Sequence, residues 1–153
     1  MADATRELMI MSVHPRHLHK IITGIKTVEL RKTRPSVGGG QPVALYATSP
    51  TRAVLATCTI SRVVAGAPHD LKNDLLGAAQ VTSTEYDKYF AGADRAVGLY
   101  LQNVLMLPEP ITLDHIRLTN TWHPPQTWHF VAAERLSNFV GNHQSLASIG
   151  ALL

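Results

Sequence analysis

The segment 14–34 (HPRHLHKIITGIKTVELRKTR) changes its periodicity halfway along, and this change constrains the fold more than any other feature of the sequence. Its first half predicts a short helix, because Pro15 suits the first helical position and Leu18, Ile21 and Ile22 fall on one face. Gly24 is placed to adopt the left-handed conformation that ends a helix. The segment therefore predicts an amphipathic helix followed by a tight turn.

The second half of the segment alternates as a strand does. Val28 and Leu30 share one side, and Glu29 and Arg31 share the other. If the apolar pair faces the core, the carboxylate and the guanidinium face a cleft, where each favours the charged form of the other. Lys26 lies at the mouth of the strand, just after the turn. The alternative is an exposed ion pair of little consequence beside a solvated lysine.

The remaining elements are short and follow no regular βαβ rhythm. Strands are expected over 8–13, 43–47, 52–65, 95–107 (closed by Pro108 and Pro110) and 111–118, and helices over 68–80, from 83 to Gly92 and over 132–140, with a glycine-rich loop over 35–42. This pattern argues against a doubly wound parallel sheet. It predicts an α+β protein with a compact, mostly antiparallel barrel of about six strands and two to four flanking helices.

The chain of 153 residues has the length of one domain. We expect a disordered N-terminal tail over 1–7, a single domain over 8–140 and a C-terminal extension of uncertain order over 141–153. The N-terminus has no signal-peptide pattern and no run is long enough to span a membrane, so a cytoplasmic protein without a membrane partner is expected. The single cysteine, Cys58, excludes an intramolecular disulfide and a cysteine zinc cluster.

Basic charge is concentrated in the segment 14–34, which holds six Lys and Arg against Glu29 alone, although the formal net charge of the chain is only +3. Such a concentration is a candidate footprint for a polyanion. A solvated helix face that binds nothing is the alternative. No cofactor is expected. No metal site is expected either, because His17 and His19 face apart on the predicted helix.

Gly24, Lys26, Glu29 and Arg31 form the pattern G-x-K-x-x-E-x-R, which resembles the signature of the ASCH domain family. The resemblance extends to the turn 46–50 (YATSP), to 89–96 (YFAGADRA) and to the Pro-Pro-Gln segment that begins at Pro124. It implies a PUA-like β-barrel and a nucleic-acid ligand, RNA or DNA.

The predicted binding site combines the basic segment with the other matched segments. The hydroxyls of Thr48 and Ser49 suit a phosphate or a base edge, Gln126 offers a donor and an acceptor to a base, and Trp128 offers a stacking surface. The predicted nucleic-acid-binding residues are His14, Lys26, Glu29, Arg31, Lys32, Thr48, Ser49, Arg52, Arg95, Gln126 and Trp128.

Two functions are predicted from these features. The first is a protein that binds RNA or a single-stranded or modified nucleotide, with a regulatory role left open. The second is an enzyme on the same fold, with Lys26, Tyr46 and Ser49 as its catalytic residues. A ribonuclease is favoured over an amidohydrolase of acetylated cytidine. The resemblance implies that ASCH relatives with that amidohydrolase activity carry a threonine nucleophile, whereas this chain has Glu29 at the corresponding position. A module that reads a nucleoside or small metabolite stays open, as does the oligomeric state.

Overall fold

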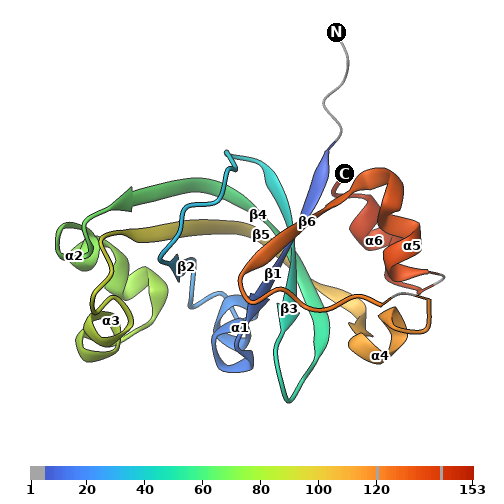
Figure 1. The fold of residues 1–153 in the computed structure, drawn as a ribbon, viewed down its shortest axis with the longest axis horizontal. Coiled ribbons are helices and arrows are strands. Elements are labelled where there is room, and N and C mark those ends of the chain that lie inside the picture. The colour runs from blue at the N-terminus through green and yellow to red at the C-terminus, as the bar shows by residue number, and fades with distance from the viewer. Residues whose placement is uncertain (1–5, 120, 142) are drawn as a thin grey trace, which may run out of the picture.

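Six strands form one mixed sheet in the computed structural model, which describes residues 6–119, 121–141 and 143–153 (Figure 1). The strand order is β2-β5-β4-β3-β1-β6. Every neighbouring pair is antiparallel except β1 and β3, which are parallel. The strands are β1 (Glu7–Val13), β2 (Val28–Arg31), β3 (Gln41–Ala47), β4 (Ala53–Gly66), β5 (Ala96–Thr112) and β6 (Trp128–Ala132).

The helices gather at the two ends of the curved sheet (Figure 1). One end carries α2 (Pro68–Ala79) and α3 (Ser83–Tyr89), and the other carries α4 (Leu113–Ile116), α5 (Leu136–Val140), which follows the 3₁₀ turn Ala133–Arg135, and α6 (Leu146–Gly150). Helix α1 (Pro15–Ile22) lies between them. In the described part of the chain, no helix has the length and apolar character needed to cross a bilayer.

The predicted α+β class and the mostly antiparallel sheet are confirmed. The sheet is strongly curved but does not close into a barrel, because β2 and β6 are its two edges among the described residues. The described residues form six α-helices, more than the two to four that the sequence predicted. Three of them, α4 to α6, have only four or five residues each.

Strand β1 is buried on both faces and separates two hydrophobic clusters. Met9 and Met11 pack with Leu18 of α1 in the first cluster. Leu8 and Ile10 pack in the second, which includes residues of α4, α5 and α6. A third cluster joins β2 to α2 and α3. The segment 141–153 contributes to the second cluster through α6, which is therefore part of the packed domain.

The local signals around the first helix are present in the structure. His14 is the N-cap of α1, and its Nδ1 accepts a hydrogen bond of 3.1 Å from the backbone N–H of Arg16. Gly24 has a φ of +86°, as the predicted left-handed turn requires. Helix α3 begins with a capping box in which Thr82 and Glu85 satisfy each other's backbone N–H groups.

The prediction that Pro108 and Pro110 end a strand is wrong. Strand β5 continues to Thr112, and both prolines lie in an irregularity where its pairing with β4 passes from Met106 to Ile111. A bulge leaves residues out of the ladder, so the missing N–H of proline costs little there. The expected strand 111–118 becomes instead the end of β5 and α4.

Candidate nucleic-acid interface

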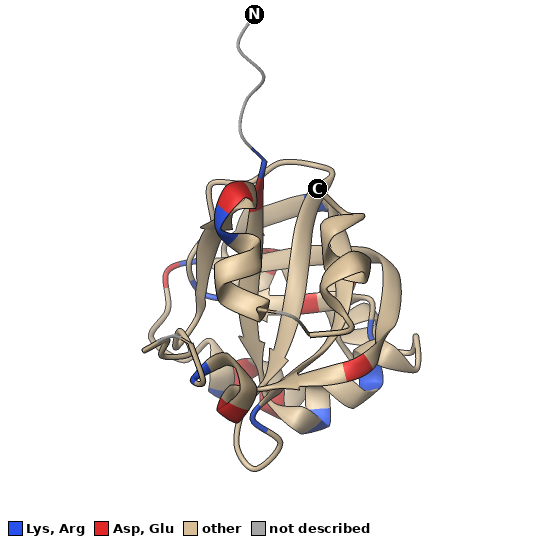
Figure 2. Ribbon diagram, turned by 90° about the vertical axis from the view of Figure 1, so that its right-hand side faces the viewer, with Lys and Arg blue, Asp and Glu red and all other residues tan. Residues whose placement is uncertain are grey.

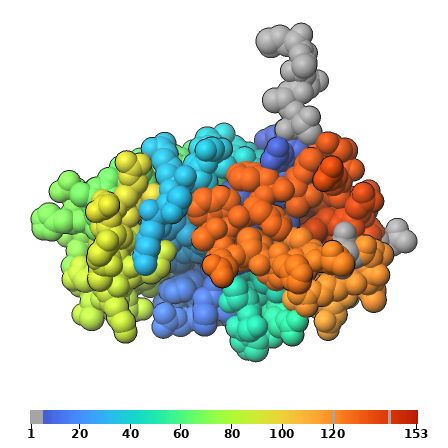
Figure 3. Space-filling view, viewed as in Figure 1, coloured from blue at the N-terminus to red at the C-terminus, as the bar shows by residue number. Residues whose placement is uncertain are grey.

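A cleft of about 700 Å³ lies between α1, β2 and α3. In the space-filling view, the yellow-green atoms of the α3 region lie beside the blue atoms of the segment that follows β2 (Figure 3). The lining residues of the cleft are Ser12, Val13, His14, Arg16, His17, Lys26, Glu29, Leu30, Arg31, Lys32, Val81, Glu85, Tyr86, Lys88 and Tyr89. The lining therefore includes Lys26, Glu29 and Arg31 of the G-x-K-x-x-E-x-R pattern.

Glu29 sits at the centre of a buried charge network on the floor of the cleft. Its Oε2 lies 3.1 Å from Nη2 of Arg31, and its Oε1 lies 3.8 Å from Nζ of Lys26. The three residues are only 2–8% exposed, so the network is far more buried than the alternation of the strand suggested. Ion pairs in such surroundings hold their partners firmly, because an unpaired buried charge is costly.

Lys26 is anchored to the end of α2. Its Nζ donates a hydrogen bond of 2.6 Å to the carbonyl of Ala79, the last residue of that helix. Burial lowers the pKa of Lys26, and the nearby carboxylate of Glu29 opposes this shift. The ammonium is therefore held in place by protein groups and is not a free phosphate clamp.

Arg31 joins the edge strand β2 to β1 and to the residue before β6. Its Nη2 donates a hydrogen bond of 2.7 Å to the carbonyl of Ser12, and its Nη1 lies 3.5 Å from the carbonyl of Thr127. Its Nε is buried and has no hydrogen-bond partner. The guanidinium thus keeps one unused N–H in the wall of the cleft.

His17 is a lining residue that the sequence analysis missed. Its Nδ1 is also buried without a hydrogen-bond partner. Burial, and next the positive charge of Lys26, lower the pKa of His17, so its imidazole is neutral at neutral pH. Its ring lies edge-on to that of His14, with ring centroids 6.3 Å apart. This i, i+3 spacing of two histidines on one helix was the signal available in the sequence.

The rim of the cleft is basic and aromatic. Arg16 of α1 reaches Glu85 of α3 at 3.4 Å across an exposed part of the rim. Nζ of Lys32 lies 4.8 Å from the ring centroid of Tyr89, whose hydroxyl donates to the carbonyl of Leu30 at 3.3 Å. A cation over an aromatic face is a favourable contact.

The whole formal net charge of the chain is concentrated in this cleft. Five Lys and Arg and two Glu line it, an excess of three positive charges. The other residues hold nine Lys and Arg and nine Asp and Glu, so they balance. On the face that carries α5 and α6, basic and acidic residues are interspersed (Figure 2).

Seven predicted site residues are not in this lining: Tyr46, Thr48, Ser49, Arg52, Arg95, Gln126 and Trp128. Two of their segments nevertheless adjoin it. The backbone N–H of Thr48 donates to the carbonyl of Val13 at 3.0 Å, and Oγ of Ser12 donates to the carbonyl of Pro125 at 2.7 Å. The end of β1 therefore connects the cleft to the 46–50 turn and to the segment that contains Gln126.

The other predicted residues have different surroundings. Tyr46 is 2% exposed and packs edge-on against Trp122, with ring centroids 5.5 Å apart. Burial raises the pKa of Tyr46, and the positive charges of Arg52 and Arg117 oppose this shift. Trp128 packs against the first hydrophobic cluster. Arg95 is exposed between α3 and β5.

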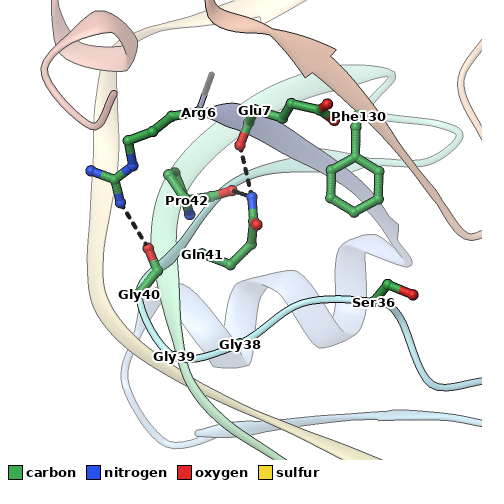
Figure 4. Close-up of a pocket in the computed structure, with 9 residues that line it drawn as sticks. All are labelled: Arg6, Glu7, Ser36, Gly38, Gly39, Gly40, Gln41, Pro42 and Phe130. Carbon is green, nitrogen blue, oxygen red and sulfur yellow. Dashed lines mark hydrogen bonds between the residues drawn. The ribbon is translucent and has the colours of Figure 1, made fainter. Parts of the chain in front are cut away.

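A second hollow of about 420 Å³ lies beside the glycine-rich loop (Figure 4). Two of its polar side chains are bonded to the protein itself: Arg6 donates to the carbonyl of Gly40 at 3.2 Å, and Gln41 donates to the carbonyls of Glu7 at 2.8 Å and Pro42 at 3.0 Å. Its two charged side chains, Arg6 and Glu7, have opposite signs. This hollow has no excess charge to attract a polyanion.

Within the described residues, no group of three or more His, Cys, Asp or Glu is placed to hold a metal ion. Cys58 is buried in the first cluster, and burial raises the pKa of its thiol to about 12. The chemistry of the cleft is thus that of paired charges, imidazole and aromatic rings.

Comparison with known proteins finds relatives that share both sequence and fold with this chain. No family model matches the chain. An ASCH domain-containing ribonuclease of Zymomonas mobilis is 26% identical over 136 residues, which cover 88% of this chain and 91% of the relative. The crystal structure of ASCH from Zymomonas mobilis superposes with a TM-score of 0.80 at 25% identity, covering 88% of this chain and 94% of that one. The chain is therefore similar to ASCH domain proteins in sequence and in fold over most of its length.

A tyrosine-to-phenylalanine variant of the Zymomonas mobilis ASCH protein gives a TM-score of 0.81 at 25% identity, covering 90% of this chain and 99% of that one. The N-terminal domain of Staphylothermus marinus McrB shares the fold at 12% identity, with a TM-score of 0.58 and coverage of 89% and 94%. In this chain, the Lys, Glu and Arg of the ASCH-like pattern lie together in the cleft described above.

Proposed function

We propose that this ASCH-like domain binds RNA in the cleft between α1, β2 and α3. The observation that carries the proposal is the concentration of the chain's entire excess positive charge in that one cleft. A local excess of positive charge attracts the phosphates of nucleic acids and raises the rate of encounter. The relative in Zymomonas mobilis is named a ribonuclease, which supports RNA over other polyanions.

The size of the cleft favours single-stranded RNA or an unpaired nucleotide. A volume of about 700 Å³ lies within the usual range for small-molecule sites and is too small to follow the groove of a duplex. The walls include the aromatic residues Tyr86 and Tyr89 and the apolar residue Val81. Such walls suit the base of an unpaired nucleotide, while the exposed Lys32 and Lys88 of the rim suit its phosphates.

The test is fluorescence anisotropy with labelled single- and double-stranded RNA and DNA at low and moderate salt. The wild type is expected to bind single-stranded RNA best. Lys88→Glu, which reverses an exposed charge on the rim, is expected to weaken binding by about tenfold at low salt, because each phosphate contact depends on charge. Arg135→Glu makes the same change outside the cleft and is expected to leave affinity unchanged. Equal loss in both variants would contradict the assignment of the cleft.

Ribonuclease activity is the second candidate, and the surroundings of Tyr46 favour it. The positive charges of Arg52 and Arg117 act on its hydroxyl and oppose the rise in the pKa of Tyr46 that burial causes. A hydroxyl beside guanidinium groups can transfer a proton or stabilise charge on a phosphate during cleavage. An amidohydrolase is less well supported, since Glu29 is held by two cations and is not a free nucleophile.

Denaturing gels of the same RNA after incubation test the second candidate. Tyr46→Phe keeps the packing against Trp122 and removes the hydroxyl, so a ribonuclease is expected to lose most of its cleavage while still binding RNA. Lys26→Met tests the alternative catalytic group, because it preserves the length of a buried side chain and removes its charge. If the wild type leaves the RNA intact, the ribonuclease candidate is wrong and RNA binding without cleavage is the function that stays.

A further inference from the structure

Two polar nitrogens in the wall of the cleft have no partner. One is Nε of Arg31 on β2, and the other is Nδ1 of His17 on α1. Both are buried, and both belong to residues that line the cleft. Buried polar groups in folded proteins nearly always have a hydrogen-bond partner, so such atoms call for an explanation. The two nitrogens belong to different elements, and both residues line the same cleft. This placement points to one ligand that contacts both nitrogens.

The charge of the floor indicates what kind of ligand this is. Lys26, Glu29 and Arg31 carry two positive charges and one negative charge, and all three are buried. His17 adds no charge, because it is neutral at neutral pH. One buried positive charge is therefore left without a carboxylate partner. Burying an uncompensated charge is costly, and an anionic ligand removes that cost.

The unpartnered groups are suited to an oxyanion. Arg31 Nε–H can only donate, and a neutral imidazole donates when its proton is on Nδ1. Solvent does not reach either nitrogen in the empty cleft, so a ligand contacts them only when a wall side chain shifts. Charge-assisted hydrogen bonds are about twice as strong as neutral ones, so a phosphate offsets such a shift better than a neutral base edge does.

We propose that the floor of the cleft is a subsite for the terminal phosphate of RNA, whose oxygens accept hydrogen bonds from Arg31 Nε and His17 Nδ1. A terminal phosphate is favoured over an internal one because only the end of a strand can place a phosphate against buried atoms without threading the chain through the floor. This inference rests on the proposed RNA-binding function and adds that strand ends are distinguished.

The experiment compares one short RNA sequence with a 5′-phosphate, a 3′-phosphate or hydroxyls at both ends, by anisotropy. At least one phosphorylated form is expected to bind about ten- to a hundredfold more tightly than the hydroxyl form, the range expected for hydrogen bonds to a charged group. His17→Ala is expected to abolish most of this preference. His19→Ala, an exposed histidine on the same helix, is expected to retain it.

A second measurement uses the wild type alone, so its result does not depend on whether the His17→Ala variant folds. Addition of inorganic phosphate is expected to shift the imidazole NMR signals of His17 and leave those of His19 unchanged. Equal affinity for all three RNAs would overturn the phosphate subsite and leave RNA binding intact. Tight binding of a nucleoside monophosphate without binding of any RNA would support the subsite and overturn the proposed RNA function.

Discussion

The guanidinium of Arg31 on β2 donates a hydrogen bond of 2.7 Å to the backbone carbonyl of Ser12 on β1. Strand β2 is an edge of the sheet, and β1 lies four places away in the strand order. One side chain therefore links parts of the sheet that no backbone ladder joins. The same guanidinium pairs with Glu29, so the fold and the charge of the cleft depend on one residue.

Arg31→Ala is expected to lower the free energy of unfolding by roughly 3–5 kcal/mol, since it leaves Glu29 buried with only Lys26 as a partner. Urea denaturation followed by circular dichroism measures this change. Arg34→Ala removes an exposed arginine three residues away and is expected to change stability by less than about 0.5 kcal/mol. A small effect at Arg31 would show that its contacts do not stabilise the sheet.

Gly98→Ala is expected to destabilise the protein by about 1–3 kcal/mol through overpacking. A Cβ at this position would lie 2.9 Å from Leu75 and 3.0 Å from Val64, where α2 packs on β5. Gly77→Ala provides a control with the opposite sign. No atom lies within 4 Å of a Cβ there, and alanine favours a helix interior by up to about 1 kcal/mol. Thermal unfolding of the two variants should shift in opposite directions.

His129→Gln is expected to weaken the dependence of stability on acid pH. Burial lowers the pKa of His129 from its ordinary value of 6.5, and its Nε2 accepts a hydrogen bond of 2.9 Å from Trp122. Below pH 6.5 the unfolded chain binds a proton more readily than the folded one, so stability falls as the pH drops through the folded pKa.

Urea midpoints at pH 7.5 and 5.5 test this prediction. Glutamine keeps an acceptor for Trp122 and does not titrate, so the variant should lose less stability on acidification than the wild type. His17, whose pKa is also lowered, contributes to the remaining loss. His69→Gln, an exposed position on α2, should behave as the wild type does. An unchanged pH dependence in His129→Gln would exclude this histidine as a source.

Lys32→Ala is expected to reduce the salt dependence of RNA binding. Each phosphate contact to single-stranded nucleic acid contributes about 0.7 to the slope of log affinity against log salt, so loss of one contact should lower the slope by that amount. Anisotropy titrations at four salt concentrations measure the slope. An unchanged slope with a lower affinity would indicate that Lys32 acts through Tyr89 and not through a phosphate.

Local sequence signals predicted those elements whose ends are determined by residues close together in the chain. The proline, glycine and alternating residues of the segment 14–34 predicted α1, its turn and β2, and a helix from 83 to Gly92 was predicted where α3 lies. Tertiary arrangement was less accessible. Helix α3 begins 54 positions after Glu29 in the chain, yet both line the same cleft, and no local periodicity reports that proximity. The bulge that accommodates Pro108 likewise depends on pairing with β4.

The sequence predicted which types of residue form the site, but it did not predict how deeply each of them is buried. Alternation placed Glu29 and Arg31 on one face, and the structure pairs them. It could not indicate that both are buried, because burial depends on the helix ends and β1 residues that surround them. The sequence placed His17 off the apolar face of the predicted helix and gave no sign that it lines the cleft. Its unpartnered nitrogen is visible only when α1 is packed beside β2.

Strands β2 and β6, the two edges of the sheet, have only four and five residues. An exposed edge strand can pair with a strand of another molecule, and short edges limit this because they offer few free N–H and C=O groups. Arg31 adds to this protection by tying β2 to its own chain. The residue that contributes positive charge to the cleft thereby also holds an edge strand of the sheet in place.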